Sequence, residues 1–198
     1  MDSSLRASRN DRILSENWAG VLLNPPSYGF YTNVTARFTG GIDLFLSPTG
    51  VPQYKPWYEF YPLNTVDFDL DINPGNKVQV DITTSTAVKG TITITNLSTR
   101  KSVHQVVYAP KGNSLCRKYA GWIVEDQPSS KGGLDPLNNF GTVTFTDIAA
   151  HLNTGATKDL TQSNTVFSML QDTSPVRTLA DVQFKGDKSF SVTLSAHP

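Results

Sequence analysis

Short segments of alternating apolar and polar residues are the feature of this sequence that most restricts its fold. Alternation is clearest in residues 77–82 (KVQVDI) and 90–95 (GTITIT), and it predicts half-buried β-strands there. The same pattern occurs in residues 102–108, 141–146, 181–185 and 190–194. Gly, Pro and Asn clusters with turn chemistry separate these segments. Many short strands at intervals of about 8 to 12 residues predict an all-β fold, an antiparallel β-sandwich or barrel.

The strand pattern also divides the chain. Residues 1–16 lack it and are predicted to be a flexible N-terminal arm. Residues 147–152 (DIAAHL) are the one segment that suggests a helix, of a single short turn. No linker, repeat or shift in composition interrupts the remainder, so residues 17–198 are predicted to form a single β-sandwich domain.

Composition excludes several kinds of partner. The 198 residues include 17 Lys+Arg and 17 Asp+Glu, and this balance argues against a nucleic-acid footprint or a surface for acidic lipid. No segment approaches the roughly 18 unbroken apolar residues of a membrane span. Residues 1–12 lack the apolar stretch of about 7 to 15 residues found in a secretory signal. We expect a monomer that binds neither nucleic acid nor a membrane.

Cysteine and histidine usage gives no reason to expect a metal ion or a cofactor. Cys116 is the only cysteine, so neither an internal disulfide nor a two-cysteine metal site can form. The three histidines are far apart in the sequence and lack ligand-type spacing.

Three acids alternate in residues 66–72 (VDFDLDI), a pattern that invites a calcium interpretation. An EF-hand loop then needs Gly at its sixth position and Glu at its twelfth, where this chain has Ile72 and Val78. We expect the acids on the wet face of a strand, with Phe68, Leu70 and Ile72 facing inward.

Two segments place acids beside large aromatic residues. In residues 57–62 (WYEFYP), alternation puts three side chains on one face, namely Trp57, Glu59 and Tyr61. In residues 119–128 (YAGWIVEDQP), it separates Glu125 from the apolar side chains of Trp122 and Val124. A carboxyl group among apolar neighbours loses solvation, which raises its pKa and suits it to general acid or base chemistry. The alternative is a strand-edge acid without a chemical role.

These segments resemble the glutamic peptidases, or eqolisins, the pepstatin-insensitive acid endopeptidases found chiefly in fungi. Residues 17–20 (NWAG), 57–62 (WYEFYP) and 120–126 (AGWIVED) are similar to the family's NWAG, WYEWYP and AEWIVED motifs. The resemblance continues, in order, through residues 34–39 (VTARFT), 41–43 (GID), 115–116 (LC) and 139–146 (NFGTVTFT). It spans roughly residues 17–194.

The resemblance implies a concanavalin-like sandwich of two antiparallel sheets and an acid endopeptidase that hydrolyses a polypeptide substrate. Glu125 matches the family's catalytic glutamate, which activates a water as general base and then protonates the leaving amine. The residues expected to contact substrate are Asp43, Trp57, Glu59 and Tyr61. The family is secreted, so the resemblance also implies secretion, although this chain shows no signal sequence.

The family's second catalytic residue is missing. In relatives, a glutamine in an L-Q-x-G-V strand positions the water and stabilises the oxyanion, but residues 46–51 (LSPTGV) place Pro48 there. Gln53 is the local substitute: if residues 53–61 form one strand, it shares a face with Trp57 and Glu59. The alternative is an edge-loop glutamine without a role. Relatives that carry a disulfide have the partner of the L-C cysteine near G-I-D, so Cys116 would be left unpaired.

The missing glutamine leaves two further hypotheses. The chain could be an inactive relative that binds a peptide or glycan through Trp57, Tyr58, Tyr61 and Trp122. Alternatively, the sequence is an incomplete gene model that lost a signal, a propeptide and an internal exon, and the motif glutamine with them.

Overall fold

A computed structural model describes residues 12–39, 44–46, 52–60, 63–127, 132–134, 137–161, 164–171 and 177–195. All named elements in these residues are β-strands, and none of the described residues belongs to a helix that could cross a membrane. The first half contains β1 (Arg12–Ser15), β2 (Trp18–Leu23), β3 (Tyr31–Thr39), β4 (Leu44–Leu46), β5 (Pro52–Tyr54), β6 (Trp57–Tyr58), β7 (Val66–Asp67) and β8 (Lys77–Thr86). The second half contains β9 (Lys89–Asn96), β10 (Lys101–Tyr108), β11 (Ala120–Glu125), β12 (Thr142–Leu152), β13 (Thr157–Lys158), β14 (Asn164–Gln171), β15 (Arg177–Gly186) and β16 (Ser189–Leu194).

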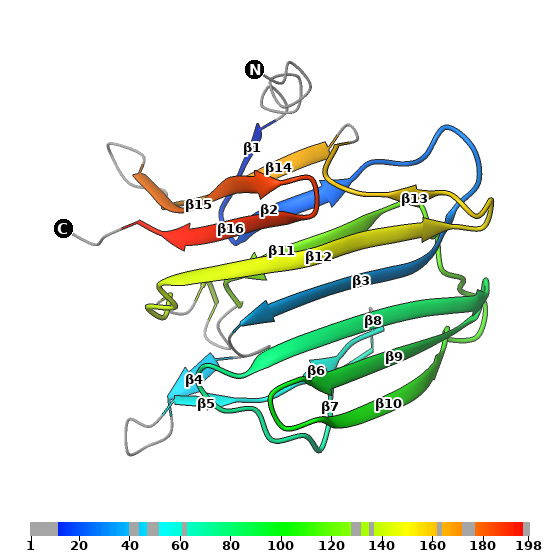
Figure 1. Cartoon of the computed structure of the whole chain (residues 1–198), viewed down its shortest axis with the longest axis horizontal. Coiled ribbons are helices and arrows are strands. Elements are labelled where there is room, and N and C mark those ends of the chain that lie inside the picture. The colour runs from blue at the N-terminus through cyan, green and yellow to red at the C-terminus, as the bar shows by residue number, and fades with distance from the viewer. Residues whose placement is uncertain are drawn as a thin grey trace.

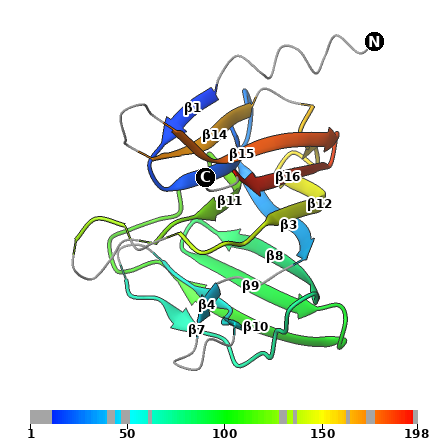
Figure 2. The ribbon, with the colours of Figure 1, turned by 90° about the vertical axis from the view of Figure 1, so that its left-hand side faces the viewer.

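One large, mostly antiparallel sheet dominates the fold. Its strand order is β10-β9-β8-β3-β12-β16-β15-β14-β2-β11, with β1 attached to β14 and β13 to β12. Figures 1 and 2 show β14–β16 at one end of the molecule and β8–β10 at the other, with β3 and β12 between them. The sheet curls so that β11, at the end of the strand order, packs against β3 and β12. Two small hairpins, β4–β5 and β6–β7, complete the all-β fold.

Two clusters of buried hydrophobic residues form the core between these strands. The larger cluster joins β2, β3, β11, β12, β14, β15 and β16, and it includes Phe190, which is fully buried. Phe190 stacks on Phe145 with ring centroids 4.9 Å apart, an offset contact that stabilises beyond the area it buries. The smaller cluster packs Leu70 and Ile72 against β8 and β9. The sequence prediction of an antiparallel β-sandwich is therefore confirmed.

The helical turn suggested for residues 147–152 is wrong. These residues continue β12, in which Ile148, Ala150 and Leu152 are buried at alternate positions, the period of a strand. Asp147 has φ 52°, and the register with β3 shifts between Thr146 and Ala149, which marks a β-bulge. The bulge reverses the local alternation, and this hid the strand from a reading of the sequence.

The segment 12–15, assigned from the sequence to the N-terminal arm, forms a strand. It pairs in parallel with β14, with Ser15 opposite Met169. The Arg12 guanidinium binds the Asp181 carboxylate and also donates to Ser168 Oγ at 3.0 Å. This part of the predicted arm is therefore tied to the sheet.

The acidic segment 66–72 lies as predicted, although only its first two residues pair as β7. Leu70 and Ile72 are buried, whereas Asp67, Asp69 and Asp71 are exposed. Two of the acids form ion pairs, Asp67 with Lys55 and Asp71 with Lys101. Their alternation therefore serves to place apolar residues in the smaller cluster.

Candidate active site

Glu125 is the last residue of β11, and its carboxylate is held by the neighbouring strand. The register places Trp18 directly opposite Glu125, so the two side chains lie on the same face. The Trp18 indole N–H donates to Glu125 Oε1 at 2.9 Å. One carboxylate oxygen is thus oriented by a hydrogen bond between chain segments 107 residues apart.

The turn between β1 and β2 supplies a side-chain amide to the same oxygen. Asn17 Nδ2 donates to Glu125 Oε1 at 3.4 Å. The Ser15 hydroxyl donates to Asn17 Oδ1 at 3.3 Å, which directs the amide nitrogen toward the carboxylate. Ser15 Oγ also accepts the backbone N–H of Trp18 at 3.1 Å, and the Asp126 N–H donates to Asn17 O at 2.8 Å. Ser15 therefore orients the Asn17 amide and also holds the backbone of Trp18.

The close approach of β2 and β11 requires glycine at position 20. A Cβ added to Gly20 would lie 2.2 Å from the carbonyl oxygen of Trp122, a backbone atom that cannot move aside. On the same face of β2, the Trp18 ring meets the Phe167 ring edge-on, with centroids 5.6 Å apart. The small residues of NWAG thus let the two strands approach, and Phe167 fixes the indole that donates to Glu125.

The opposite face of β11 belongs to the core. Trp122 is buried, and its indole N–H donates to the Thr35 carbonyl of β3 at 3.2 Å. The predicted separation of Glu125 from Trp122 and Val124 is confirmed, because Trp122 and Val124 pack in the larger cluster while Glu125 is exposed. Two predictions are wrong: Trp122 does not present an accessible stacking surface, and Glu125 is not desolvated by its aromatic neighbours.

The other predicted site residues lie elsewhere or outside the described residues. Gln53 pairs with Phe45 in the β4–β5 hairpin, and its side chain is outside the description. Residues 53–61 do not form one strand, because β5 ends at Tyr54 and β6 begins at Trp57 in a different hairpin. The interruption lies at Lys55 and Pro56, and Pro56 cannot donate a strand hydrogen bond.

The sequence argument that Gln53 lies on the same strand face as Trp57 and Glu59 therefore does not hold. Trp57 is half-buried and Glu59 is exposed, and among the described residues no recorded hydrogen bond or ring contact joins either to Glu125. Tyr58 packs against Phe68, with ring centroids 5.3 Å apart, so it contributes to the interior of this region. Asp43, Pro48 and Tyr61 lie outside the described residues.

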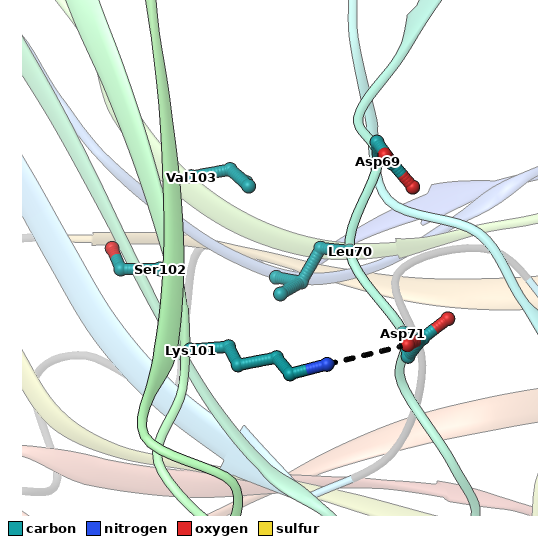
Figure 3. A pocket seen from close by; sticks show the side chains of 6 residues that line it. All are labelled: Asp69, Leu70, Asp71, Lys101, Ser102 and Val103. Carbon is teal, nitrogen blue, oxygen red and sulfur yellow. Dashed lines mark ion pairs between the residues drawn. The ribbon is translucent and has the colours of Figure 1, made fainter.

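A hollow of about 410 Å³ lies apart from these residues, between β10 and the segment that precedes β8. Its lining is Asp69, Leu70, Asp71, Lys101, Ser102 and Val103 (Figure 3). The Lys101 ammonium and Asp71 carboxylate are 3.6 Å apart, and both side chains are well exposed. A solvated ion pair of this kind gives no specific chemistry.

Metal chemistry finds no support in the described part of the chain, where no group of three or more His, Cys, Asp or Glu side chains is placed to hold an ion. Cys116 is exposed and free.

Among the described residues, the arrangement with catalytic potential is thus the exposed carboxylate of Glu125 with its two donors. Such a carboxylate can accept a proton from water and return it to a leaving group.

Ser15, Asn17 and Trp18 are the functional candidates that the sequence did not single out. The NWAG segment is similar to a motif of the family, but nothing local shows that it pairs with residues 120–125. The available signal is the polar Asn17, followed by the indole N–H donor of Trp18, at the start of a strand that is otherwise apolar. Its relation to Glu125 depends on the register between the two strands.

Comparison with known proteins identifies the family of this chain. Residues 39–194 match the model of the Peptidase A4 family. Aspergillopepsin-2 of Aspergillus niger is 33% identical over 162 residues, which cover 81% of this chain and 54% of that protein. Scytalidopepsin B of Scytalidium lignicola is 27% identical over 171 residues, covering 72% of this chain and 66% of that protein. The chain thus spans about half to two thirds of the length of these relatives.

Solved structures show the same fold. Scytalido-glutamic peptidase with a peptide-based transition state analog superposes with a TM-score of 0.68 at 22% identity, covering 91% of this chain and 99% of that one. Aspergilloglutamic peptidase from Aspergillus niger gives a TM-score of 0.66 at 26% identity, covering 83% of this chain and 99% of that one. The match to the family model over most of the sequence shows that this chain belongs to the Peptidase A4 family, the glutamic peptidases or eqolisins.

Proposed function

We propose that this protein is an acid endopeptidase of the glutamic type, with Glu125 as its general base and general acid. The observation that carries the proposal is the hydrogen bond from the Trp18 indole to Glu125 Oε1 at 2.9 Å. This bond holds one oxygen of an exposed carboxylate and leaves Oε2 for a water molecule. A carboxylate oriented in this way needs little reorganisation when the water attacks.

The proposed reaction has two proton transfers. Glu125 accepts a proton from water as the water oxygen attacks the peptide carbonyl, which forms a tetrahedral intermediate. The protonated Glu125 then gives that proton to the amine nitrogen as the C–N bond breaks, so the carboxylate is regenerated. One carboxyl group thereby acts first as base and then as acid.

An amide is still required to bind the developing oxyanion, and Asn17 is the candidate that we favour. Its Nδ2 lies beside Glu125, and the Ser15 hydroxyl fixes its orientation. Gln53 is the competing candidate from the sequence. Because β5 and β6 belong to separate hairpins, the shared-face argument for Gln53 no longer applies.

The proposed substrate is a polypeptide. One structural relative, scytalido-glutamic peptidase, was crystallised with a peptide-based transition state analog, which supports this substrate class for the family. On the basis of family membership, we propose that four residues contact the substrate, namely Asp43, Trp57, Glu59 and Tyr61. On the same basis, we propose that the protein is a secreted, monomeric peptidase.

The central test compares Glu125→Gln with Glu16→Gln. Glu16 is also an exposed glutamate, in the β1–β2 turn, but among the described residues the donors to Glu125 are Asn17 and Trp18, so Glu16 is a matched control. Cleavage of a denatured protein substrate is measured between about pH 2 and 5. We expect the first variant to retain only a small residual rate and the second to cleave like the unaltered protein. Equal cleavage by both variants would exclude Glu125 as the catalyst.

The amide assignment is tested by comparing Asn17→Leu with Gln53→Leu. Loss of an oxyanion donor lowers the rate by about 10²–10³. We expect that loss in the Asn17 variant and near-normal rates in the Gln53 variant, and the reverse result would assign the amide to Gln53. Peptide binding without cleavage by the unaltered protein would instead support an inactive relative.

A further inference from the structure

The strand that carries Glu125 has only one pairing partner among the described residues. β11 ends the strand order of the large sheet and pairs with β2. In an antiparallel ladder, residues alternate between pairs that exchange two hydrogen bonds and pairs that exchange none. The bond from Asp126 N–H to Asn17 O identifies Asn17/Asp126 as a hydrogen-bonded pair.

Counting back along the register shows which backbone groups point away from β2. Val124 and Trp122 form hydrogen-bonded pairs with β2, because each lies two residues further from Asp126. Gly121, Ile123 and Glu125 therefore direct their N–H and C=O groups toward the opposite edge. Among the described residues, these three form no backbone hydrogen bond outside the β2–β11 ladder.

Within the described residues, β11 itself carries none of the sequence features that normally prevent strand addition. The sequence of β11, AGWIVE, contains no proline and no lysine. Its pairing with β2 runs without a register shift from Ala120 to Glu125, so no bulge twists the edge away. An unguarded edge of this kind is a template for an additional strand.

Charge along the edge indicates what would bind there. Lys118 is exposed just before β11, and Glu125 is exposed at its end. An extended peptide that pairs antiparallel with β11 would place its N-terminal part beside Glu125 and its C-terminal part beside Lys118. A basic residue in the first part and an acidic residue in the second would complement these charges.

We propose that the free edge of β11 binds an extended polypeptide as an additional antiparallel strand, and that this strand passes the Glu125 carboxylate. The choice of a polypeptide as ligand rests on the proposed function. Main-chain hydrogen bonds from Gly121, Ile123 and Glu125 would supply affinity largely independent of sequence, as in other cases of strand addition. The terminal charges would set the direction of the bound strand.

The test uses a labelled octapeptide, acetyl-KVTVTVTE-amide, whose binding to the intact chain is measured near neutral pH by fluorescence anisotropy. Mass spectrometry confirms that the peptide stays intact. Two further peptides carry N-methyl groups on alternate residues, one on the odd positions and one on the even positions. Only the set that faces β11 can lose hydrogen bonds to it, because strand hydrogen bonds alternate.

We expect one methylated peptide to bind at least about tenfold more weakly and the other to bind like the parent. Equal binding of both would overturn the proposal. Lys118→Glu should weaken the parent about threefold and favour acetyl-KVTVTVTK-amide, in which only the C-terminal Glu that faces position 118 is replaced by Lys. Unchanged preference in that variant would overturn the proposed direction.

The protein variant Ile123→Pro removes an outward N–H, which a strand edge tolerates. We expect it to fold and to lose peptide affinity, whereas Val124→Pro, the control, should unfold because its N–H bonds to β2. Concentration-dependent dimerisation that blocks the peptide would instead assign the edge to a second copy. If only one of the two methylated peptides loses affinity but the protein cleaves no substrate, the proposed activity alone is refuted. If the protein cleaves substrate but both methylated peptides bind equally, the strand addition alone is refuted.

Discussion

Replacement of Trp18 by phenylalanine isolates the hydrogen bond on which the proposed catalyst depends. The substitution keeps an aromatic ring that can contact Phe167 but removes the indole N–H that donates to Glu125 Oε1 at 2.9 Å. A hydrogen bond to a charged group contributes about 1.5–3 kcal/mol. Trp18 is 38% exposed and Glu125 is exposed, so solvent screening reduces this to about 1 kcal/mol.

That free energy corresponds to about a fivefold lower kcat/KM, since each 1.36 kcal/mol is a factor of about ten. The assay follows cleavage of a quenched fluorescent peptide at acid pH, with thermal unfolding measured in parallel. We expect the rate to fall while the melting temperature changes little, because the ring remains packed.

A double-mutant cycle makes this prediction specific. Trp18→Phe should slow the unaltered enzyme but leave the residual rate of Glu125→Gln unchanged, because the indole acts through the carboxylate. An equal slowing in both backgrounds would show that the ring, rather than its bond to Glu125, affects catalysis. An unchanged kcat/KM in the single variant would refute the view that this bond orients the carboxylate.

Three further changes test the surrounding structure. Gly20→Ala should prevent normal β2–β11 pairing and abolish cleavage, because its Cβ would lie 2.2 Å from the Trp122 carbonyl oxygen; circular dichroism and activity would show this. Phe190→Ala should lower the free energy of unfolding by about 3–5 kcal/mol in urea titrations, because Phe190 is fully buried. Burial raises the pKa of Tyr31, whose hydroxyl donates to the Asn24 carbonyl at 2.8 Å. Its stabilising contribution is present below about pH 10 and lost as pH rises through the raised value, so Tyr31→Phe should flatten the alkaline loss of stability.

The strands could be predicted because alternation is a local property. Residues 190–194 (FSVTL) alternate, and Phe190 and Val192 are fully buried in β16 as a half-buried strand requires. The failure at residues 147–152 has a local cause as well, since the bulge at Asp147 shifts the phase of burial within β12. The strand at residues 12–15 is only four residues long, and both its pairing with β14 and the contact of Arg12 with Asp181 join distant segments that no local pattern contains.

The site could be predicted only in part, because alternation gives the face of a strand but not its partner. The motif WIVED identified Glu125 by resemblance, and the predicted faces of β11 are correct. The donors to Glu125 come from residues more than a hundred positions earlier. A shift of one residue in the β2–β11 register would move Trp18 to the opposite face, so the register decides whether the bond exists.

The same distinction separates the arguments for the two candidate amides. The argument for Gln53 required one uninterrupted strand from residue 53 to 61, and the break at Lys55 and Pro56 removes its premise. The argument for Asn17 requires that its backbone is anchored and that its side-chain amide is oriented. The Asp126 N–H anchors the backbone by donating to Asn17 O, and the Ser15 hydroxyl orients the amide by donating to Asn17 Oδ1. Ser15→Ala should therefore slow catalysis even though Ser15 itself donates nothing to Glu125, and a normal rate in that variant would count against Asn17 as the oriented amide.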